Sequence, residues 1–307
     1  MSFFTIPIRF YRIEMVLLIF IFFFNEVETQ EQTTEVKTYT NLVEAFQNPS
    51  DIRILDLGDQ GIKILPRQIG QLQNLTTLHL DGNSLTTLPE EIGQLQKLEK
   101  LDLSSNQLTV LPKEIGQLQN LRELDLNRNK LTTLPNEIGQ FQKLEKLDLS
   151  SNQLTVLPKE IEQLQNLIEL DLNRNKLTTL PNEIGQFQKL EKLDLSSNQL
   201  TTLPKEIEQL KNLESLNLEY NPLVAFPKEI GQLRKLEYLD LSENLLATFP
   251  KEIKQLRKMR KLDLNRNELT VLPKEIEQLK NLRELDLHEN QLTIFPDHIG
   301  QLKSWKS

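Results

Sequence analysis

Apolar side chains recur along this chain with a period of 23 residues. If Ile52 is counted as position 1, a large apolar residue occupies positions 1, 4, 6, 11, 14, 18 and 21 of each of eleven successive units. Asparagine shares the period at position 9 from the second unit onward, and proline shares it at position 15 in every unit. One unit of this length cannot bury its apolar face alone, so the pattern predicts a stacked array rather than a single globular core.

The first part of each unit predicts a short β-strand. Leu101 and Leu103 alternate with the polar residues Lys100, Asp102 and Ser104, which is the period-2 pattern of a strand with one buried face. The repetition predicts one parallel strand per unit. The asparagine at position 9 is placed to bond backbone groups in the turn that leaves the strand, and stacked copies are expected to form a side-chain ladder.

The second part of each unit predicts a short helical turn. In the segment "PKEIGQL", Pro112 suits the first position of a helix, where its missing N–H costs no hydrogen bond. Ile115 and Leu118 are then expected to point inward. Strands stack about 4.8 Å apart, whereas packed helices need about 8 to 10 Å, so the strand side is expected to form the inside of a curve.

The frame of the unit, L-x-x-L-x-L-x-x-N-x-L-x-x-L-P-x-x-I-x-Q-L-x-x, resembles the leucine-rich repeat family, and the resemblance covers residues 52 to 304. It implies an α/β fold, a solenoid in the shape of a curved horseshoe, with one parallel strand per repeat on the concave face and short helical turns on the convex face. It also implies that the concave face binds a protein partner. The chain is similar to secreted bacterial leucine-rich repeat proteins.

The first 30 residues differ in kind from the repeats. Arg9 and Arg12 precede an apolar run from Met15 to Phe24, and a polar tract follows it. This order is typical of a secretory signal, and the run is short for a membrane span, which needs about 20 apolar residues. We therefore expect residues 1–30 to be a signal peptide or an uncleaved membrane anchor.

Both open ends of the array are expected to carry a cover. Residues 31–51 are predicted to form a linker and an N-terminal capping helix, with Asn41 and Glu44 at capping-box spacing. One face of this helix is expected to hold three apolar residues, Leu42, Val43 and Phe46. Residues 52–307 are then predicted to hold eleven repeats and a short C-terminal cap, in which Trp305 falls at position 1 of an incomplete twelfth unit and covers the last core.

Charge and composition narrow the range of partners. The net charge of −8 disfavours nucleic acid and anionic membrane as partners, because both are bound by basic surfaces. The absence of cysteine excludes disulfides, thiol nucleophiles and cysteine-ligated zinc. Contact with a membrane is expected only through an uncleaved N-terminal segment. The expected molecule is a monomer with a protein partner.

The chain contains none of the common catalytic signatures G-x-S-x-G, G-x-x-x-x-G-K, G-x-G-x-x-G and H-E-x-x-H. His79 at position 5 would lie between Asp56 and Asp102 of the neighbouring strands, in a row that could hold a metal ion or orient a proton. We interpret His79, His288 and His298 as solvated side chains. The sequence therefore predicts no enzymatic activity, no cofactor and no metal site, and it disfavours the alternative of a hydrolase or metal site around His79.

Aspartate fills most of position 5, so a column of carboxylates is expected across the sheet. Its members are Asp56, Asp102, Asp125, Asp148, Asp171, Asp194, Asp240, Asp263 and Asp286. Neighbouring carboxylates about 4.8 Å apart repel one another. We expect alternating lysine and glutamate at position 3, together with Arg128, Arg174 and Arg266 at position 8, to neutralise the column. The alternative is recognition of a basic partner or of calcium.

Identical units offer identical surfaces, so a unique binding site is expected where the repeat departs from its own pattern. The departures gather between residues 213 and 249, where Tyr220 stands at position 8 and Tyr238 at position 3 of the next unit. Exposed tyrosine is enriched among binding hot spots. The candidate partner-binding residues, here called the tyrosine surface, are Ser215, Asn217, Glu219, Tyr220, Tyr238, Asp240 and Glu243.

The sequence thus predicts a non-enzymatic protein-binding module that is exported to the periplasm, the cell surface or the medium. Its concave face is expected to engage a protein partner, such as a host or cell-surface protein. The alternative is a scaffold or structural repeat protein that stays in the cytoplasm. A mature protein that begins near residues 25 to 32 would favour export.

Overall fold

The computed structural model describes residues 37–294 and 304–306. The predicted signal or anchor in residues 1–30 and the predicted solvated residue His298 lie outside the described residues. In the part of the chain that is described, no helix is both long and apolar enough to cross a membrane.

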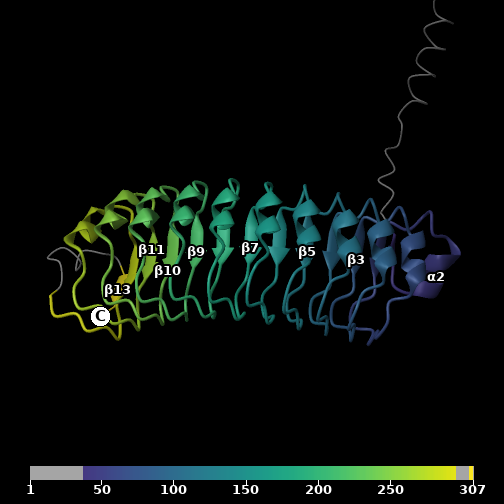
Figure 1. Ribbon diagram of the computed structural model, residues 1–307, viewed down its shortest axis with the longest axis horizontal. Coiled ribbons are helices and arrows are strands. Elements are labelled where there is room, and N and C mark those ends of the chain that lie inside the picture. Colours follow the sequence, from purple (N-terminus) through teal and green to yellow (C-terminus); the bar gives the residue numbers. More distant parts are fainter. Residues whose placement is uncertain (1–36, 295–303, 307) are drawn as a thin grey trace, which may run out of the picture. The chain divides into compact units, whose positions relative to one another are not determined.

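A single parallel sheet runs through the described repeats, and its strands follow one another in chain order (Figure 1). The strands are β1 (Thr38–Tyr39), β2 (Ile54–Asp56), β3 (Thr77–His79), β4 (Lys100–Asp102), β5 (Glu123–Asp125), β6 (Lys146–Asp148), β7 (Glu169–Asp171), β8 (Lys192–Asp194), β9 (Ser215–Asn217), β10 (Tyr238–Asp240), β11 (Lys261–Asp263), β12 (Glu284–Asp286) and β13 (Ser304–Lys306). From β2 to β12, each residue pairs with the residue one period away, as Leu101 does with Leu124. The prediction of one parallel strand per unit is confirmed.

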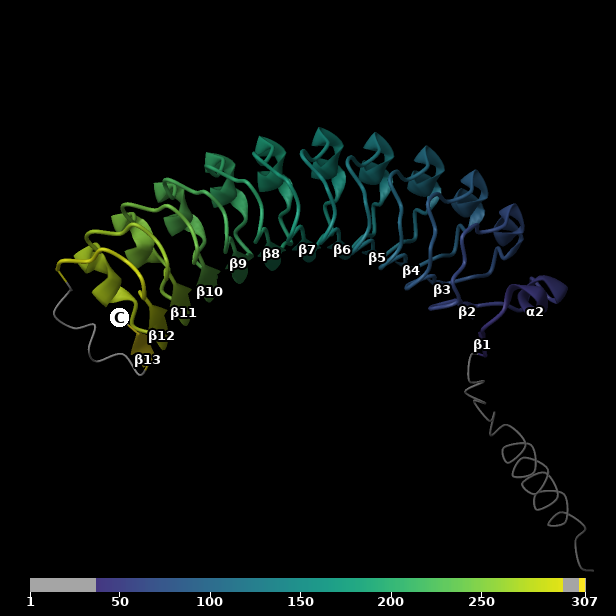
Figure 2. The ribbon, with the colours of Figure 1, turned by 90° about the horizontal axis from the view of Figure 1, so that it is seen from below.

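Each strand is followed by a 3-10 helix on the opposite side of the repeat. The helices are η1 (Arg67–Gln71), η2 (Glu90–Gln94), η3 (Lys113–Gln117), η4 (Asn136–Gln140), η5 (Lys159–Gln163), η6 (Asn182–Gln186), η7 (Lys205–Gln209), η8 (Lys228–Gln232), η9 (Lys251–Gln255) and η10 (Lys274–Gln278). Figure 2 shows that the repeat array, taken by itself, is an arc with the strands along its inner side and these helices along its outer side. The predicted curvature is therefore confirmed.

The role expected of the proline at position 15 is partly wrong. Pro112 precedes η3 and has an extended backbone (φ −66°, ψ 146°), so it is the residue before the helix rather than its first residue. Its carbonyl oxygen accepts a 3.1 Å hydrogen bond from the Ile115 N–H, which closes the first tight turn. The Leu118 N–H closes the last turn by donating to the Ile115 carbonyl oxygen at 3.1 Å. The proline therefore sets the direction in which the chain enters the helix.

The core is a column of side chains that continues from repeat to repeat. The seven apolar positions are buried in the inner repeats, as Leu101, Leu103, Leu108 and Ile115 illustrate with no exposed surface, whereas Ile62 and Leu292 in the first and last repeats are partly buried. Phe141 and Phe187 replace leucine at position 21 and are also fully enclosed. Each repeat therefore covers the core of its neighbours, which explains how units too small to fold alone form a stable array.

The asparagine at position 9 joins each repeat to the one before it. The Asn152 side-chain amide donates to the carbonyl oxygens of Leu126, Leu149 and Ser150 at 2.9 to 3.2 Å, and its Oδ1 accepts from the Leu131 N–H at 3.0 Å. The other asparagines from Asn83 to Asn290 make the same set of bonds. The predicted bonds to the backbone are confirmed, whereas the predicted side-chain ladder is not, because the bonds of each asparagine side chain run to backbone groups.

Replacing Asn152 by Ala is expected to lower the free energy of unfolding by about 3 kcal/mol, because several buried backbone groups lose their partner at once. A urea titration followed by circular dichroism measures the change. The matched control is Gln153→Ala at the next position, which is expected to change stability by less than about 0.5 kcal/mol. Equal stability of the two variants would show that the asparagine ladder does not hold the repeats together.

The buried face of the N-terminal capping helix differs from the prediction at one residue. Helix α2 (Leu42–Gln47) begins after Asn41, whose Oδ1 accepts a 2.7 Å hydrogen bond from the Glu44 N–H as predicted. Val43, however, is 73% exposed, and Ala45 is buried in its place. Residues three and four positions after Leu42 lie on its face of a helix, whereas Val43 is turned about 100° away from it.

The C-terminal end also departs from the prediction. Strand β13 pairs with β12 so that Trp305 lies beside Leu285, which occupies position 4 of its unit. Trp305 therefore takes a position-4 place in the backbone register rather than the predicted position 1. Its side chain, and the cover predicted from it, lie outside what the structure describes.

Two nearly identical stretches, residues 101–146 and 147–192, differ at Gly116 and Glu162, and the structure explains the glycine. A Cβ atom at Gly116 would lie 2.7 Å from the Gln140 side-chain oxygen and 2.8 Å from the Glu137 carbonyl oxygen. Neighbouring 3-10 helices therefore approach closely where this position is glycine. Where Glu162 replaces it, a shallow hollow lies on the convex side, lined by Gln142, Glu162, Gln163, Gln165 and Gln186.

Candidate binding surface on the concave face

A groove of about 420 Å³ runs along the concave face from β4 to β9. It is lined by residues at positions 3, 4 and 5 of the strands, and only the side chains at positions 3 and 5 face it because the leucine at position 4 points into the core. Because the register is fixed, side chains at one position form a straight row across the sheet. The chemistry of the groove is thus set by the two rows at positions 3 and 5.

In the row at position 3, the lysines form ion pairs with the glutamates of neighbouring strands. Lys100 lies 3.1 Å from Glu123, and Glu169 lies between Lys146 at 3.7 Å and Lys192 at 2.7 Å. The hydrogen bond from Lys192 lowers the pKa of Glu169 below its ordinary value, and the positive charges of both lysines add to this effect. These lysines were expected to neutralise the Asp column, but the ion pairs that the structure shows for them are with glutamates of their own row.

The Asp column at position 5 is held by backbone groups instead. Asp125 Oδ1 accepts hydrogen bonds from the Asn127 N–H at 2.9 Å and from the Asn127 side-chain amide at 2.8 Å. Each position-5 aspartate accepts the same backbone bond from the residue two positions later, including Asp148, Asp171 and Asp263. Each aspartate therefore stabilises the turn that leaves its strand.

Burial raises the pKa values of three aspartates in the column. The pKa values of Asp125 and Asp171 are raised from 3.8 to about 6, first by burial and then by the neighbouring carboxylates of the column. The pKa of Asp263 is also raised, for the same reasons. A nearby lysine or arginine would lower these pKa values, so burial and the neighbouring carboxylates dominate at these three aspartates.

Arg266 at position 8 forms ion pairs other than those expected with the Asp column. Arg266 forms ion pairs with Glu243 and, at 3.1 Å, with Glu289, both of which are at position 8 of neighbouring repeats. Position 8 is in the left-handed region in each described repeat, for example at Arg128 (φ 51°) and Tyr220 (φ 56°). The ion pairs shown for Arg266 are with glutamates of its own row and not with the Asp column as predicted.

The structure places the tyrosine surface on two adjacent repeats. Tyr238 is 45% exposed and lies beside Ser215 in the sheet, while Tyr220 is 63% exposed and its N–H donates to the Ser242 carbonyl oxygen. Tyr220 is five positions further along its repeat than Ser215, the residue that pairs with Tyr238, and it lies in the turn after β9. They can contact one extended partner together, although they do not face each other across one strand pair.

In the repeat of Asn217 and Glu219, the amide stands at position 5, where most repeats have a carboxylate, and the carboxylate stands at position 7. Asn217 Oδ1 accepts from the Glu219 N–H at 3.0 Å, as an aspartate would, and its amide donates to Asp194 at 3.1 Å. The carboxylate is thus moved two positions along the chain to Glu219, which is exposed. Burial and the nearby carboxylates, led by Asp240, raise the pKa of Glu219.

The groove and the tyrosine surface overlap only in part. Ser215 and Asn217 line the end of the groove, whereas the remaining members of the tyrosine surface lie beyond it. Sequence reasoning left out two exposed apolar neighbours from the candidate set, Val224 (55% exposed) and Leu245 (44% exposed). The available signal was that positions 10 and 12 are polar in most other repeats.

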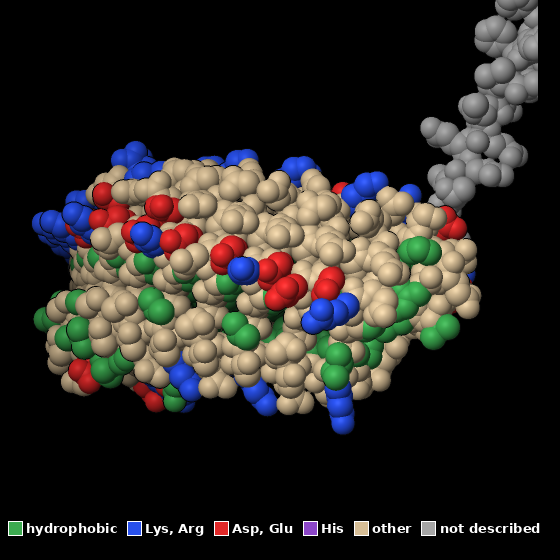
Figure 3. All heavy atoms as spheres, turned by 45° about the vertical axis from the view of Figure 1, so that its right-hand side comes forward, with side chains coloured by type: hydrophobic (Ala, Val, Ile, Leu, Met, Phe, Trp, Pro, Cys, Tyr) green, Lys and Arg blue, Asp and Glu red, His purple; other side chains and the backbone are tan. Residues whose placement is uncertain are grey.

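Charges on the outer side of the array are dispersed. Lys113 lies 3.9 Å from Glu114 at the start of η3, as expected for exposed, solubilising charges. Figure 3 shows a face on which uncharged polar side chains and backbone dominate, with acidic and basic side chains together in a band along its length. Mixed charges of this kind favour solubility rather than steering toward one charged partner.

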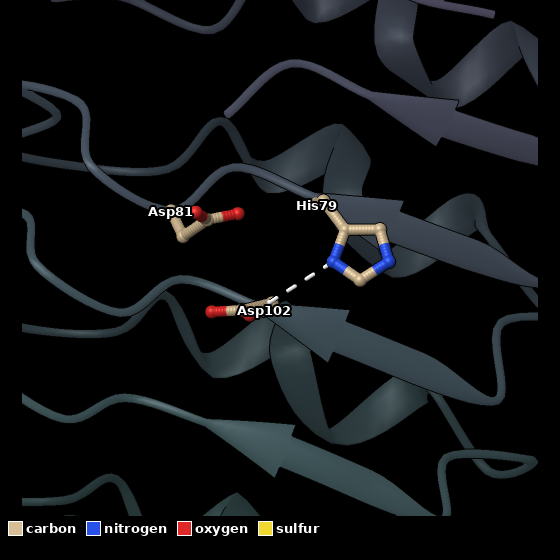
Figure 4. Close-up of side chains that lie close together, drawn as sticks. All are labelled: His79, Asp81 and Asp102. Atoms are coloured by element: carbon tan, nitrogen blue, oxygen red, sulfur yellow. Dashed lines mark ion pairs between the residues drawn. The ribbon is translucent and has the colours of Figure 1, made fainter. Parts of the chain in front are cut away.

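Three metal-ligating side chains meet near the N-terminal end of the sheet. His79 lies between Asp56 and Asp102 in the strand register, as predicted. The group whose ligand atoms all lie within 4.8 Å of one another, however, is His79, Asp81 and Asp102 (Figure 4). Sequence reasoning missed Asp81 because it considered only strand positions, whereas Asp81 stands two residues after its strand, where the chain turns.

Comparison with known proteins identifies the repeat. The family model that describes a leucine-rich repeat region matches residues 34–130, 112–219, 169–265 and 227–307. No curated protein matches the chain. Among solved structures, a leucine-rich repeat protein of Leptospira interrogans is 38% identical, with a TM-score of 0.54, over 87% of this chain and 99% of that chain.

Two further structures resemble the chain over most of its length. The functional domain of InlJ from Listeria monocytogenes is 30% identical, with a TM-score of 0.71, over 82% of this chain and 52% of that chain. The leucine-rich repeat ectodomain of a plant receptor kinase from Arabidopsis thaliana, solved with CASPARIAN STRIP INTEGRITY FACTOR 2, is 32% identical, with a TM-score of 0.55, over 83% of this chain and 37% of that chain. The chain therefore belongs to the leucine-rich repeat family, whose members commonly serve as protein-interaction modules.

Proposed function

We propose that this protein is a non-enzymatic binding module whose concave face engages a protein partner at the tyrosine surface. The observation that carries the proposal is the exposure of Tyr220 and Tyr238 on adjacent repeats, at positions that are small or charged in most other units. Aromatic side chains contribute large contact areas at low entropic cost, and they are frequent among binding hot spots. The regular repeats act as the rigid frame that presents this surface.

The groove beside the tyrosine surface supports the same location. Ser215 and Asn217 join the tyrosine surface to the row of ion-paired lysines and glutamates, so a partner could contact aromatic and charged groups together. Val224 and Leu245 extend the exposed apolar area toward the flank of the same two repeats. An interface that combines an aromatic centre with a polar surround is typical of specific protein recognition.

A crosslinking experiment tests whether the partner binds the concave face of the sheet or the convex side. A photoreactive amino acid is placed at Ser215 on the concave face, at Thr77 at the same position near the other end of the sheet, or at Lys113 on the convex side. After irradiation with the partner captured by the full chain, we expect a crosslinked product from Ser215 and not from Lys113 or Thr77. A product from Lys113 alone would contradict binding at the concave face.

We further propose that the protein is exported, on the basis of Arg9 and Arg12 before the apolar run from Met15 to Phe24. Protein isolated from its own cells is expected to begin between Asn25 and Gln32, because signal peptidases remove such segments. Intact-mass spectrometry measures this boundary. A mature chain that retains Met1 and stays in the cytoplasm would favour an intracellular scaffold.

A further inference from the structure

We propose that His79, Asp81 and Asp102 form a binding site for a divalent transition-metal ion such as Zn²⁺. The site lies several repeats away from the tyrosine surface, on β3, β4 and the turn after β3 (Figure 4). It is independent of the proposed protein-binding function. Among the residues that the structure describes, no other group of three such side chains converges in this way.

The distances between the ligand atoms are close to those that one ion requires. Two ligand atoms bound to the same Zn²⁺ lie at most about 4.2 Å apart, since each is about 2.1 Å from the ion. His79 Nδ1 and Asp102 Oδ2 are 3.8 Å apart, which is too long for a hydrogen bond but fits two ligands of one ion. The whole set lies within 4.8 Å, whereas the ligands of one tetrahedral Zn²⁺ lie about 3.4 Å apart, so side-chain rotations must bring the widest pair closer by up to about 1.4 Å.

The surrounding backbone already orients two of the ligands. Asp102 Oδ1 accepts a 3.0 Å hydrogen bond from the Ser104 N–H, and this bond leaves Oδ2 directed toward His79. A Cβ atom at Gly58 would come 3.0 Å from Asp81 Oδ1, so the glycine leaves space for that carboxylate. Preorientation by a neighbouring hydrogen bond is a common property of metal ligands.

The ligands also coincide with departures from the repeat. Position 5 is aspartate in most units and position 7 is often serine or asparagine, whose side chain can bond that aspartate. In the second unit these two positions are His79 and Asp81. In place of the usual hydrogen-bonded pair, this unit has an imidazole that lies beside Asp102 of the next strand and a carboxylate that belongs to the same group of possible ligands.

The donor set indicates which ions bind. One imidazole nitrogen and two carboxylate oxygens suit Zn²⁺ and its neighbours in the transition series, whereas Ca²⁺ and Mg²⁺ prefer oxygen ligands alone. The two carboxylates balance the charge of a divalent ion. All three residues are half-buried, so coordination positions remain for water or for a ligand from outside.

Isothermal titration of the tag-free full chain with zinc sulfate at pH 7.5 tests the site. One Zn²⁺ per chain is expected to bind, and Ca²⁺ and Mg²⁺ at the same concentration are not. The test variants are His79→Asn and Asp81→Ser, whose new residues occur at the same repeat positions in Asn217 and Ser104 and are therefore compatible with the fold. Each is expected to weaken zinc binding at least about tenfold, since even the loss of an outer partner costs that much.

His288→Ala is the matched control, because His288 also lies beside an aspartate, with Nδ1 3.5 Å from Asp286 Oδ1, but is not part of a group of three ligands. It is expected to leave zinc binding unchanged. Circular dichroism of each variant establishes that the repeats remain folded. The proposal is overturned if zinc does not bind to the folded chain, if it binds both test variants as tightly as the natural chain, or if calcium binds equally well.

Discussion

Replacing Asp125 and Asp171 together by Asn is expected to raise the free energy of unfolding by about 2 kcal/mol per site at pH 7.5, and by less than about 1 kcal/mol per site at pH 4. Folding raises the pKa of both carboxyls from 3.8 to about 6, so the native state holds these protons more tightly than the unfolded chain. The stability gained from that proton uptake is complete below pH 3.8 and is lost as the pH rises through 6. Asparagine has no such charge to bury.

The fold itself contains the precedent for this substitution. Asn217 occupies the same position, and its Oδ1 accepts the same backbone hydrogen bond that Asp125 and Asp171 accept. The turn is therefore retained in the variant. Thermal or urea unfolding at the two pH values measures the change, with Glu99→Gln at an exposed position as the control. Equal stabilisation at pH 4 and pH 7.5, or none at pH 7.5, would show that burial of the column carries no cost.

The fold was predictable because the same pattern of apolar, asparagine and proline residues recurs in successive 23-residue units. The leucines at positions 4 and 6 of every unit are buried in the structure, and the asparagine at position 9 makes the backbone bonds predicted for it. Repetition turns a weak pattern in one strand of three residues into a strong one, since a chance match would not recur at the same spacing. Parallel pairing and curvature then follow from the different widths of strands and helices.

The ends and the side-chain contacts were less predictable. Val43 and Ala45 occur only once, so a six-residue helix offered too few positions to define its buried face. The register of Trp305 depends on the path of the preceding segment, which the repeat period does not constrain.

For the candidate sites, the sequence predicted residue positions in the repeat better than side-chain partners. Ser215 and Tyr238 lie in adjacent strands as expected, whereas Tyr220 lies in the turn that follows β9. The partners of each charge were not predictable, because lysine and arginine side chains are long enough to reach either the Asp column or the glutamates beside them. Asp81 was missed for a related reason, since only the path of the turn after β3 brings it close to His79.

The double variant Tyr220→Ala with Tyr238→Ala is expected to weaken binding of the captured partner at least about 100-fold and to leave the repeats folded, since each hot-spot truncation costs about 2 kcal/mol. Both side chains are exposed, and neither belongs to the buried core. Loss of core packing is therefore not the cause of the expected effect.

The matched control is Arg174→Ala with Lys192→Ala, two repeats earlier at the same two positions. Arg174 shares the left-handed backbone of Tyr220, with φ of 51° against 56°, so the alanine carries the same backbone cost in both variants. Lys192 forms an exposed ion pair with Glu169, and the loss of such a pair changes stability by less than about 1 kcal/mol. This control is expected to bind within about threefold of the natural chain, because equivalent side chains recur at Arg128 and Lys146.

The most direct measurement of the central claim is therefore a calorimetric titration of the captured partner into the full chain and these two double variants. Binding at the tyrosine surface predicts a dissociation constant raised at least about 100-fold for the tyrosine variant and nearly unchanged for the control. Equal affinities for the two variants would contradict the claim that the function of this protein lies where its repeat departs from its own pattern.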